Sequence, residues 1–213
     1  VHDLWGGLNI IDIRLQSIFL SFLPPFHSFG FTVLSILPLI TGVKVAYTPN
    51  PTNFGEVLDA LKNTKANNIM ATPTFLKMLM AKAEPDDMAS VELVISGAES
   101  LHIDIKTQFE KMTAGHNSLI IEGYGITECA PIVSLNPLDT QKINSVGKAI
   151  KGLDLLVVNP ENFSPVKVLE EGMFLVSGPS VFPGYLDNKI DSPFIEIEGK
   201  TYYKTGDLGY IDE

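Results

Sequence analysis

A hydroxyl and a carboxylate follow an aromatic residue that lies between two glycines in the segment Glu122-Gly123-Tyr124-Gly125-Ile126-Thr127-Glu128. The aromatic ring offers a stacking face for a flat ligand, and the glycines let the backbone turn sharply and approach it. A threonine hydroxyl can donate to a phosphate oxygen. A carboxylate beside a phosphate repels it unless a divalent cation such as Mg²⁺ bridges the two. The order therefore indicates contacts for a nucleotide base, a phosphate and a metal. The alternative is a strand-to-helix turn with Thr127 as the helix cap and Glu128 in the first helical turn.

A second polar segment, Thr205-Gly206-Asp207, lies near the carboxyl end of the chain. The Asp207 carboxylate can accept two hydroxyl groups, as those of a ribose. The segment also fits an ordinary β-turn in which Asp207 bonds its own backbone. Both interpretations stay open at this point.

Two other reactive side chains need an interpretation. His27 lies in the aromatic loop Pro25-Phe26-His27-Ser28-Phe29-Gly30, where it is either a packed loop residue or a catalyst. Cys129 follows the acid Glu128, which raises a thiol pKa, so we expect it to pack in the core instead of acting as a nucleophile. The four histidines show no spacing typical of zinc, and we assign no structural metal.

Apolar runs alternate with helical patterns over the first two thirds of the chain. Strands are expected at 17–23, 43–47, 68–71, 91–95 and 118–121. Helices are expected at 29–40, after a cap at Asn53, from Thr72 to near Glu84, and after a cap at Ser100. This alternation predicts an α/β fold, with a mostly parallel sheet and helices on both of its faces. Ligands of such sheets lie beyond the carboxyl ends of the strands. Of the five segments that could carry chemistry, four begin within a few residues of a predicted strand's carboxyl end, so we expect them to share one cleft; the five are 25–30, 96–100, 122–131, 171–185 and 203–209.

The pattern changes near Ser145. Short β-rich runs at 153–158, 173–177, 201–204 and 208–211 are separated by Gly, Pro and Asn, and no long helix is expected. We predict an α/β unit over residues 1–144 and a smaller β-rich unit over residues 145–213.

Composition restricts the partners. The chain has 213 residues, 45% of them hydrophobic, and a formal net charge of −10. The isoelectric point is about 4.8, without a basic cluster, so we expect no nucleic acid partner. The single cysteine is typical of a reducing compartment, which favours the cytoplasm. Prolines interrupt the most apolar region, 18–47, so no membrane span is expected.

The order and spacing of these segments resemble the adenylate-forming superfamily, which includes acyl-CoA synthetases, luciferases and peptide-synthetase adenylation domains. Five motifs carry the resemblance along nearly the whole chain: the FHxxG loop at 26–30, the Gly97-Ala98-Glu99 turn, the YGxTE motif at 124–128, the stretch Gly172 to Tyr185, and the TGD motif at 205–207. The resemblance implies that the β-rich unit is a distorted barrel.

The resemblance also implies roles for individual residues. Tyr124 would stack on adenine, Asp207 would hold the ribose hydroxyls, Thr127 would contact the α-phosphate, and Glu128 would bind Mg²⁺. His27 would border the acyl pocket. The adenine pocket would be lined by Gly97, Ala98, Glu99, the Glu122-Gly123 backbone and Gly125. The implied reaction is attack of a carboxylate on ATP to give acyl-adenylate and pyrophosphate, followed by transfer of the acyl group to a thiol.

Within the superfamily, the segments 23–31, 96–99 and 122–131 are most similar to the bacterial acyl-acyl-carrier-protein synthetase half of 2-acylglycerophosphoethanolamine acyltransferase. That resemblance implies a long-chain fatty acid, a carrier protein or CoA as thiol acceptor, and reacylation of a lysophospholipid by a parent enzyme associated with the membrane. The superfamily's phosphate loop, basic hinge and small carboxyl-terminal domain are not found in these residues. We therefore expect a fragment with little or no turnover by itself. A non-catalytic nucleotide-binding module is the alternative.

Overall fold

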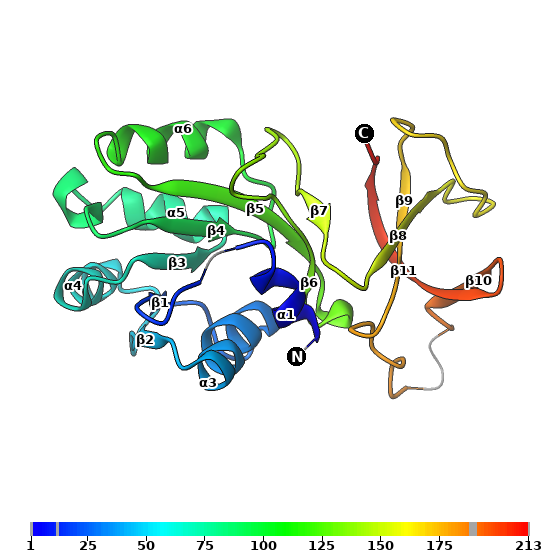
Figure 1. The fold of residues 1–213 in the computed structure, drawn as a ribbon, viewed down its shortest axis with the longest axis horizontal. Helices are drawn as coiled ribbons and strands as arrows, with labels where there is room; N and C mark the ends of the chain where they lie inside the picture. The colour runs from blue at the N-terminus through cyan, green and yellow to red at the C-terminus, as the bar shows by residue number, and fades with distance from the viewer. Residues whose placement is uncertain (1, 12, 188–190, 213) are drawn as a thin grey trace.

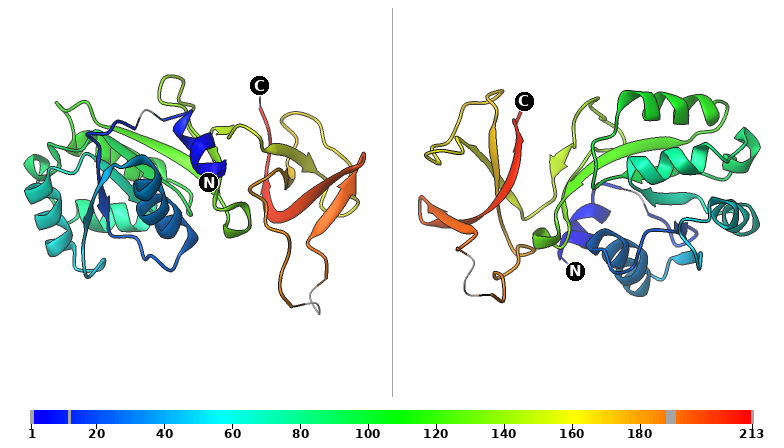
Figure 2. Two further views of the ribbon diagram at one scale, coloured as in Figure 1. Left: turned by 60° about the horizontal axis from the view of Figure 1, so that its bottom comes forward. Right: turned by 180° about the vertical axis from the view of Figure 1, so that it is seen from behind.

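The computed structural model describes residues 2–11, 13–187 and 191–212. Two β-sheets form its framework, and they stand side by side along the longest axis of the molecule (Figure 1). The larger sheet has seven strands in the order β2-β1-β3-β4-β5-β6-β7, and the smaller has four in the order β10-β11-β9-β8. Two further views show the same separation (Figure 2).

Five strands of the larger sheet are parallel: β1 (Ile18–Ser21), β2 (Lys44–Tyr47), β3 (Asn68–Ala71), β4 (Leu93–Ser96) and β5 (Leu119–Gly125). Two short antiparallel strands, β6 (Ile132–Leu135) and β7 (Lys148–Ala149), complete it beyond β5. The prediction of a mostly parallel sheet is therefore confirmed.

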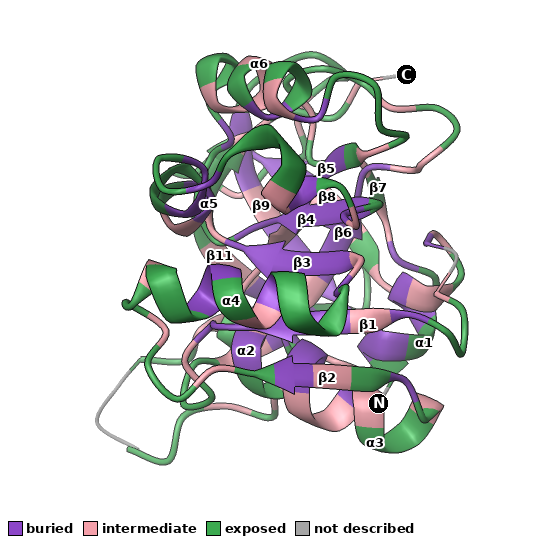
Figure 3. Ribbon diagram, turned by 90° about the vertical axis from the view of Figure 1, so that its left-hand side faces the viewer, coloured by how far each residue is buried: buried purple, intermediate pink, exposed green. Residues whose placement is uncertain are grey.

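Helices cover both faces of this sheet, as predicted. One face packs against α4 (Phe54–Thr64), α5 (Pro73–Met80) and α6 (Ile103–Met112), and the other against α1 (His2–Leu8), α2 (Ser28–Phe31) and α3 (Leu37–Thr41). Side chains of alternate residues in one strand point to opposite faces of the sheet: Ile69 packs on the α4–α5 side and Met70 on the α1–α3 side. The central strands are consequently buried between exposed helical surfaces (Figure 3).

The helices differ from the prediction at three places. The helix expected at 29–40 ends at Gly42, whose φ is +76°, as predicted, but it contains a π-helical segment, Thr32–Ile36, between α2 and α3. The helix α5 ends at Met80, before the predicted end near Glu84, and a separate 3₁₀ turn follows at Pro85–Met88.

The third difference concerns the cap of α6. His102 is the N-cap, and its Nδ1 accepts a hydrogen bond from the Asp104 N–H at 3.4 Å, so the prediction of Ser100 as cap is wrong. The physical reason is that the Leu101 N–H donates to the Glu122 carboxylate at 3.0 Å, which holds the chain out of the helix for two more residues.

The smaller sheet is antiparallel and consists of β8 (Asp154–Val158), β9 (Gly172–Ser177), β10 (Phe194–Ile197) and β11 (Lys200–Gly209). The predicted run 201–204 and the first half of the run 208–211 belong to one strand, β11, which ends at Gly209 and whose pairing with β9 shifts between Lys204 and Leu208. Strand β10 was not predicted. The division at residue 144 stays a prediction, because β7 at 148–149 still pairs with β6.

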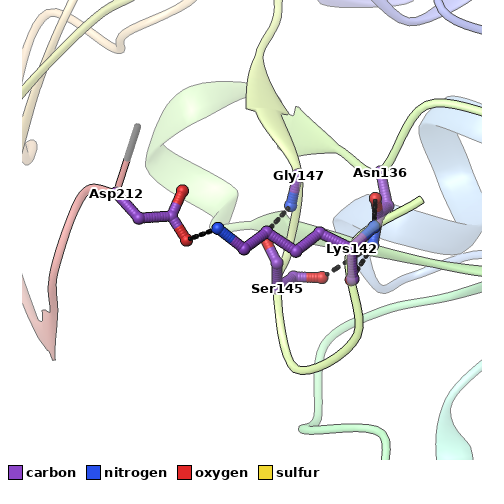
Figure 4. A network of polar contacts seen from close by, with 5 residues as sticks. All are labelled: Asn136, Lys142, Ser145, Gly147 and Asp212. Atoms are coloured by element: carbon purple, nitrogen blue, oxygen red, sulfur yellow. Dashed lines mark hydrogen bonds and ion pairs between the residues drawn. The ribbon is translucent and has the colours of Figure 1, made fainter. Parts of the chain in front are cut away.

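The loop between β6 and β7 connects the larger sheet to the end of the chain (Figure 4). The buried Asn136 amide donates to the carbonyls of Lys142 and Ser145 and accepts from the Lys142 N–H, at 2.7, 3.0 and 3.0 Å. The Lys142 ammonium group lies 2.6 Å from the Asp212 carboxylate beyond β11. None of the helices in the described ranges is long and apolar enough to cross a membrane.

Candidate functional site

The segment with the two glycines lies at the edge where the parallel strands end. Gly123, Tyr124 and Gly125 form the last three residues of β5, which pairs with β6 there. Neither glycine has a positive φ, so the predicted sharp turn is wrong. A side chain at Gly125 would instead put its Cβ 2.2 Å from the Pro131 carbonyl oxygen. The glycines therefore allow the close approach of the returning chain, which leaves Tyr124 fixed between them.

Tyr124 and Asp207 meet although 83 residues separate them in sequence. The Tyr124 hydroxyl donates to Asp207 Oδ2 at 2.5 Å, which joins β5 to β11. Burial, followed by this carboxylate, raises the pKa of Tyr124 far above its usual value. The phenol consequently stays protonated and remains a donor.

The segment 205–207 forms the irregularity in β11. The Thr205 hydroxyl donates to the Phe174 carbonyl at 2.8 Å and accepts from the Asp207 N–H at 3.0 Å, and Gly206 has a φ of +81°. The turn is therefore held by Thr205. The Asp207 side chain does not bond its own backbone, which removes the turn interpretation for that carboxylate.

The hydroxyl and carboxylate that follow Gly125 lie in a short 3₁₀ turn, Thr127–Cys129. The N-cap of this turn is Ile126, so the interpretation of Thr127 as a helix cap is wrong. The Thr127 hydroxyl instead lies 2.9 Å from the Ser28 hydroxyl. The Glu128 carboxylate accepts from the Tyr185 hydroxyl at 2.9 Å. Both side chains thus have partners from other parts of the chain.

His27 is the N-cap of α2. Its Nδ1 accepts from the Phe29 N–H at 3.2 Å, and its side chain is exposed. The histidine therefore organises the start of the helix, a role that the sequence analysis did not consider. It also borders a cavity of about 300 Å³ on the α2 side.

Two adjoining cavities open around Tyr124. One has a volume of about 300 Å³ and is lined by residues that include His27, Gly97, Thr127 and Glu128. The other has a volume of about 390 Å³ and is lined by residues that include Glu99 and Asp207. The two share the residues Ala98, Gly123, Tyr124, Gly125 and Ile126. The structure thus brings together all but one of the candidate residues.

The exception is Glu122, which lines neither cavity. Its carboxylate accepts from the Leu101 N–H and its carbonyl from the Asn136 N–H at 2.8 Å. Burial raises the pKa of its carboxyl group. Glu99, by contrast, lines the second cavity, but its carboxylate accepts from the Thr74 hydroxyl at 2.6 Å. Both acids therefore hold neighbouring loops in place.

Cys129 is fully buried, as predicted, and packs with Val133, Val176 and Tyr203. Burial first, and the neighbouring Glu128 second, raise the pKa of its thiol to about 12. A thiol that stays protonated is a poor nucleophile.

Two site residues were missed by the sequence analysis. Ser28 and Tyr185 contact Thr127 and Glu128, respectively. Both lie inside segments that the sequence analysis had singled out, but their pairing across 99 and 57 residues has no signal in a single sequence.

The donor set of Glu128 fits a magnesium ion. Mg²⁺ prefers oxygen ligands and takes one or two carboxylates together with substrate phosphates and water. Glu128 supplies a half-buried carboxylate beside the Thr127 hydroxyl on the wall of the 300 Å³ cavity. Within the described ranges, no group of three His, Cys, Asp or Glu side chains lies close enough to hold a metal ion. A cation here would therefore need further ligands from outside these side chains, such as phosphate oxygens and water.

Comparison with known proteins finds relatives that are named as CoA ligases. The long-chain-fatty-acid–CoA ligase of Bacillus subtilis is 28% identical over 199 residues, which are 91% of this chain and 34% of that protein. The 4-coumarate–CoA ligase 2 of Oryza sativa is 28% identical over 200 residues, 90% of this chain and 34% of that protein. The chain thus spans about a third of the length of these relatives.

The solved structure of ATP-bound MatB from Rhodopseudomonas palustris superposes with a TM-score of 0.85 at 28% identity, covering 99% of this chain and 41% of that one. The family model described as AMP-binding enzyme matches residues 2–186. Since this match covers most of the chain, including β5 and the 3₁₀ turn Thr127–Cys129, the chain belongs to the AMP-binding enzyme family.

Proposed function

We propose that this chain forms the nucleotide-binding part of an enzyme that activates a carboxylic acid with ATP and passes the acyl group to a thiol. The observation that carries the proposal is the convergence of Tyr124, Thr127, Glu128 and Asp207 on two adjoining cavities. Their chemistry, an aromatic face, a hydroxyl and two carboxylates, suits the base, phosphate, metal and ribose of a nucleotide.

In this proposal Tyr124 stacks on adenine, and the Gly97–Glu99 turn with Gly123 and Gly125 lines the base pocket. Asp207 accepts the ribose hydroxyls. Thr127 donates to the α-phosphate, and Ser28 orients its hydroxyl from 2.9 Å away. Glu128 would hold Mg²⁺, which when bound neutralises negative charge on the phosphates. His27 borders the acid pocket.

The proposed reaction depends on the alignment of the acid with the α-phosphate and needs no general base. A carboxylate oxygen of the acid forms a bond to the α-phosphorus while the bond from that phosphorus to pyrophosphate breaks. Because the nucleophile is already ionised, the chain supplies orientation and fixed donors at the phosphate. The thiol then displaces AMP from the acyl group.

The acid and the acceptor are the finer part of the proposal. The wall of the 300 Å³ cavity on the α2 side includes Phe29, Ile95, Ile132 and Leu135, which suits an apolar acid such as a fatty acid. The relatives are named as CoA ligases, which favours CoA as acceptor. Transfer to an acyl carrier protein, for reacylation of a lysophospholipid, is the narrower form that the sequence resemblance implies. A cytoplasmic location fits the single, reduced cysteine.

Trapping of the acyl-adenylate tests the acid. The complete protein is incubated with ATP, Mg²⁺ and hydroxylamine, and acids from acetate to palmitate are compared with aromatic and amino acids. Hydroxamate formation with apolar acids supports the proposal. The second step is tested by offering CoA and acyl carrier protein separately to the adenylate. A protein that binds ATP but yields no hydroxamate with any acid would favour the non-catalytic module.

A further inference from the structure

The hydrogen bond between Tyr124 and Asp207 bears on how the proposed site would bind the ribose of a nucleotide. Asp207 is exposed and lies in the irregular part of β11, where its carboxylate would be free to rotate. Its backbone is held by Thr205, but the carboxylate itself is held by the Tyr124 hydroxyl at 2.5 Å. Within residues 2–11, 13–187 and 191–212, no other hydrogen bond or ion pair reaches this carboxylate.

The contact leaves room for a ligand. An ionised carboxylate has about four acceptor positions, and the tyrosine hydroxyl occupies one of them. The remaining positions suffice for two ribose hydroxyls. Tyr124 and Asp207 also line the same cavity of about 390 Å³, so one ligand can touch the ring and the carboxylate together.

The hydroxyl is not needed for stacking. A phenylalanine ring has the same stacking face, so the hydroxyl of Tyr124 must be explained separately. Burial raises the pKa of this phenol, so the hydroxyl keeps its proton and can donate to Asp207. The tyrosine is anchored in turn by Gly123 and Gly125, which bring it close to β6.

We propose that the Tyr124 hydroxyl is a positioning group that orients the Asp207 carboxylate toward the ribose hydroxyls and thereby sets the preference for a ribonucleotide. This inference rests on the proposed function, because it assumes that the 390 Å³ cavity takes the nucleoside of ATP. The Tyr124 hydroxyl would then determine the preference for a nucleotide with ribose hydroxyls, and the Tyr124 ring would contribute to the affinity for the base.

The test compares the binding of ATP with that of 2′,3′-dideoxy-ATP, which lacks both hydroxyls. Dissociation constants are measured by calorimetry on the complete protein and on its Tyr124→Phe, Asp207→Asn and double variants. The unsubstituted protein prefers ATP by about tenfold or more, as expected for hydrogen bonds to a charged acceptor. In Tyr124→Phe this preference falls by about three- to tenfold. The affinity for the dideoxy nucleotide changes less than twofold, because the ring is retained.

The double variant separates positioning from general stability. In the Asp207→Asn background, Tyr124→Phe has no further effect on the preference. Tyr47→Phe is the matched control, since the Tyr47 hydroxyl also donates a hydrogen bond, to the Leu34 carbonyl at 2.7 Å, but lies at the far edge of the larger sheet. It leaves both affinities unchanged.

The outcomes distinguish a failure of the positioning role from a failure of the proposed nucleotide site. Equal weakening of both nucleotides in Tyr124→Phe, or an unchanged preference, overturns the positioning role while the proposed function stands. Failure of the unsubstituted protein to bind ATP, or equal binding of the two nucleotides, contradicts the proposed nucleotide site and the inference with it.

Discussion

At the scale of residues, the two carboxylates proposed to act on the nucleotide are each held by a tyrosine from another segment. Tyr124 donates to Asp207 and Tyr185 donates to Glu128, at 2.5 and 2.9 Å. Neutral donors fix the carboxylates without cancelling their charge, so both acids stay available to a cation or to hydroxyl groups. The substitutions that test these acids should therefore act on function before they act on folding.

Replacement of Glu128 by Gln tests whether the metal proposed to be held by this carboxylate stabilises the negative charge that shifts in the transition state. The variant keeps the size of the side chain and a hydrogen-bond acceptor for Tyr185. We expect kcat for adenylate formation to fall by about a hundredfold or more, with a smaller loss in ATP affinity, because such groups act on the transition state. Steady-state kinetics and ATP binding are compared on the complete protein. Equal losses in kcat and in affinity would count against this role.

Cys129 gives a prediction for alkaline pH. Burial raises its pKa from 9.0 to about 12 in the folded chain. The unfolded chain therefore loses this proton first as the pH rises, and the free energy of unfolding falls between about pH 9 and pH 12. Below the unfolded pKa the contribution is complete.

Urea unfolding at a series of pH values checks this expectation. The Cys129→Ala variant should show a shallower decrease in stability over the same interval, whatever its stability at neutral pH. The buried phenols of Tyr124 and Tyr203, whose pKa values are also raised, contribute the same sign and remain in both proteins. An identical slope in the variant would refute the assignment to the thiol.

At the scale of elements, caps decide where several helices begin. Asn53 and Thr72 accept from the Glu56 and Phe75 N–H groups at 3.5 and 3.2 Å, as the sequence predicted. His27 and His102 cap α2 and α6 through their imidazole rings. Histidine is not among the residues usually expected at this position, which explains why these two caps were missed.

The Thr72 cap provides a stability test. Thr72→Ala removes the acceptor for the Phe75 N–H and should lower the free energy of unfolding by about 1 kcal/mol. Thr72→Ser keeps the oxygen and should cost clearly less. Both variants are compared by chemical denaturation, and a serine variant as unstable as the alanine variant would show that the methyl group, and not the cap, matters.

Much of the larger sheet was predictable because its signals are local. Buried strands such as Asn68–Ala71 are short apolar runs, and β1, β2, β3 and β4 are each followed by a helix that packs on the sheet. Strand β10 was missed because Phe194–Ile197 carries an acid, Glu196, between its apolar residues and pairs only through the hairpin with β11. The contacts of Tyr124 and Glu128 depend on where distant segments meet, and no local pattern reports that.

At the scale of the whole molecule, the site lies where the two sheets meet. The side-chain contacts between the parts of the chain around them include Tyr124 with Asp207, Glu128 with Tyr185, and Lys142 with Asp212. The first two involve residues of the proposed nucleotide site. The binding of a nucleotide and the placement of the smaller sheet should therefore depend on each other.

The ion pair between Lys142 and Asp212 is expected to contribute least to the free energy of unfolding. Lys142 is largely exposed, and exposed ion pairs contribute at most about 1 kcal/mol. Lys142→Met should thus change the free energy of unfolding by less than about 1 kcal/mol, and the difference should shrink at high salt. Asn136→Ala should cost about 2–3 kcal/mol, because the backbone groups of Lys142 and the Ser145 carbonyl lose their buried partner. A larger loss in Lys142→Met than in Asn136→Ala would contradict this ranking.

The most direct test of the account is carboxylate-dependent exchange of labelled pyrophosphate into ATP by the complete protein, with and without Asp207→Ala. The account predicts exchange that requires an acid, is strongest with apolar acids and is lost in the variant. Exchange that persists in Asp207→Ala, or its absence with every acid in a folded protein that binds ATP, would contradict the proposal that these residues serve adenylate formation.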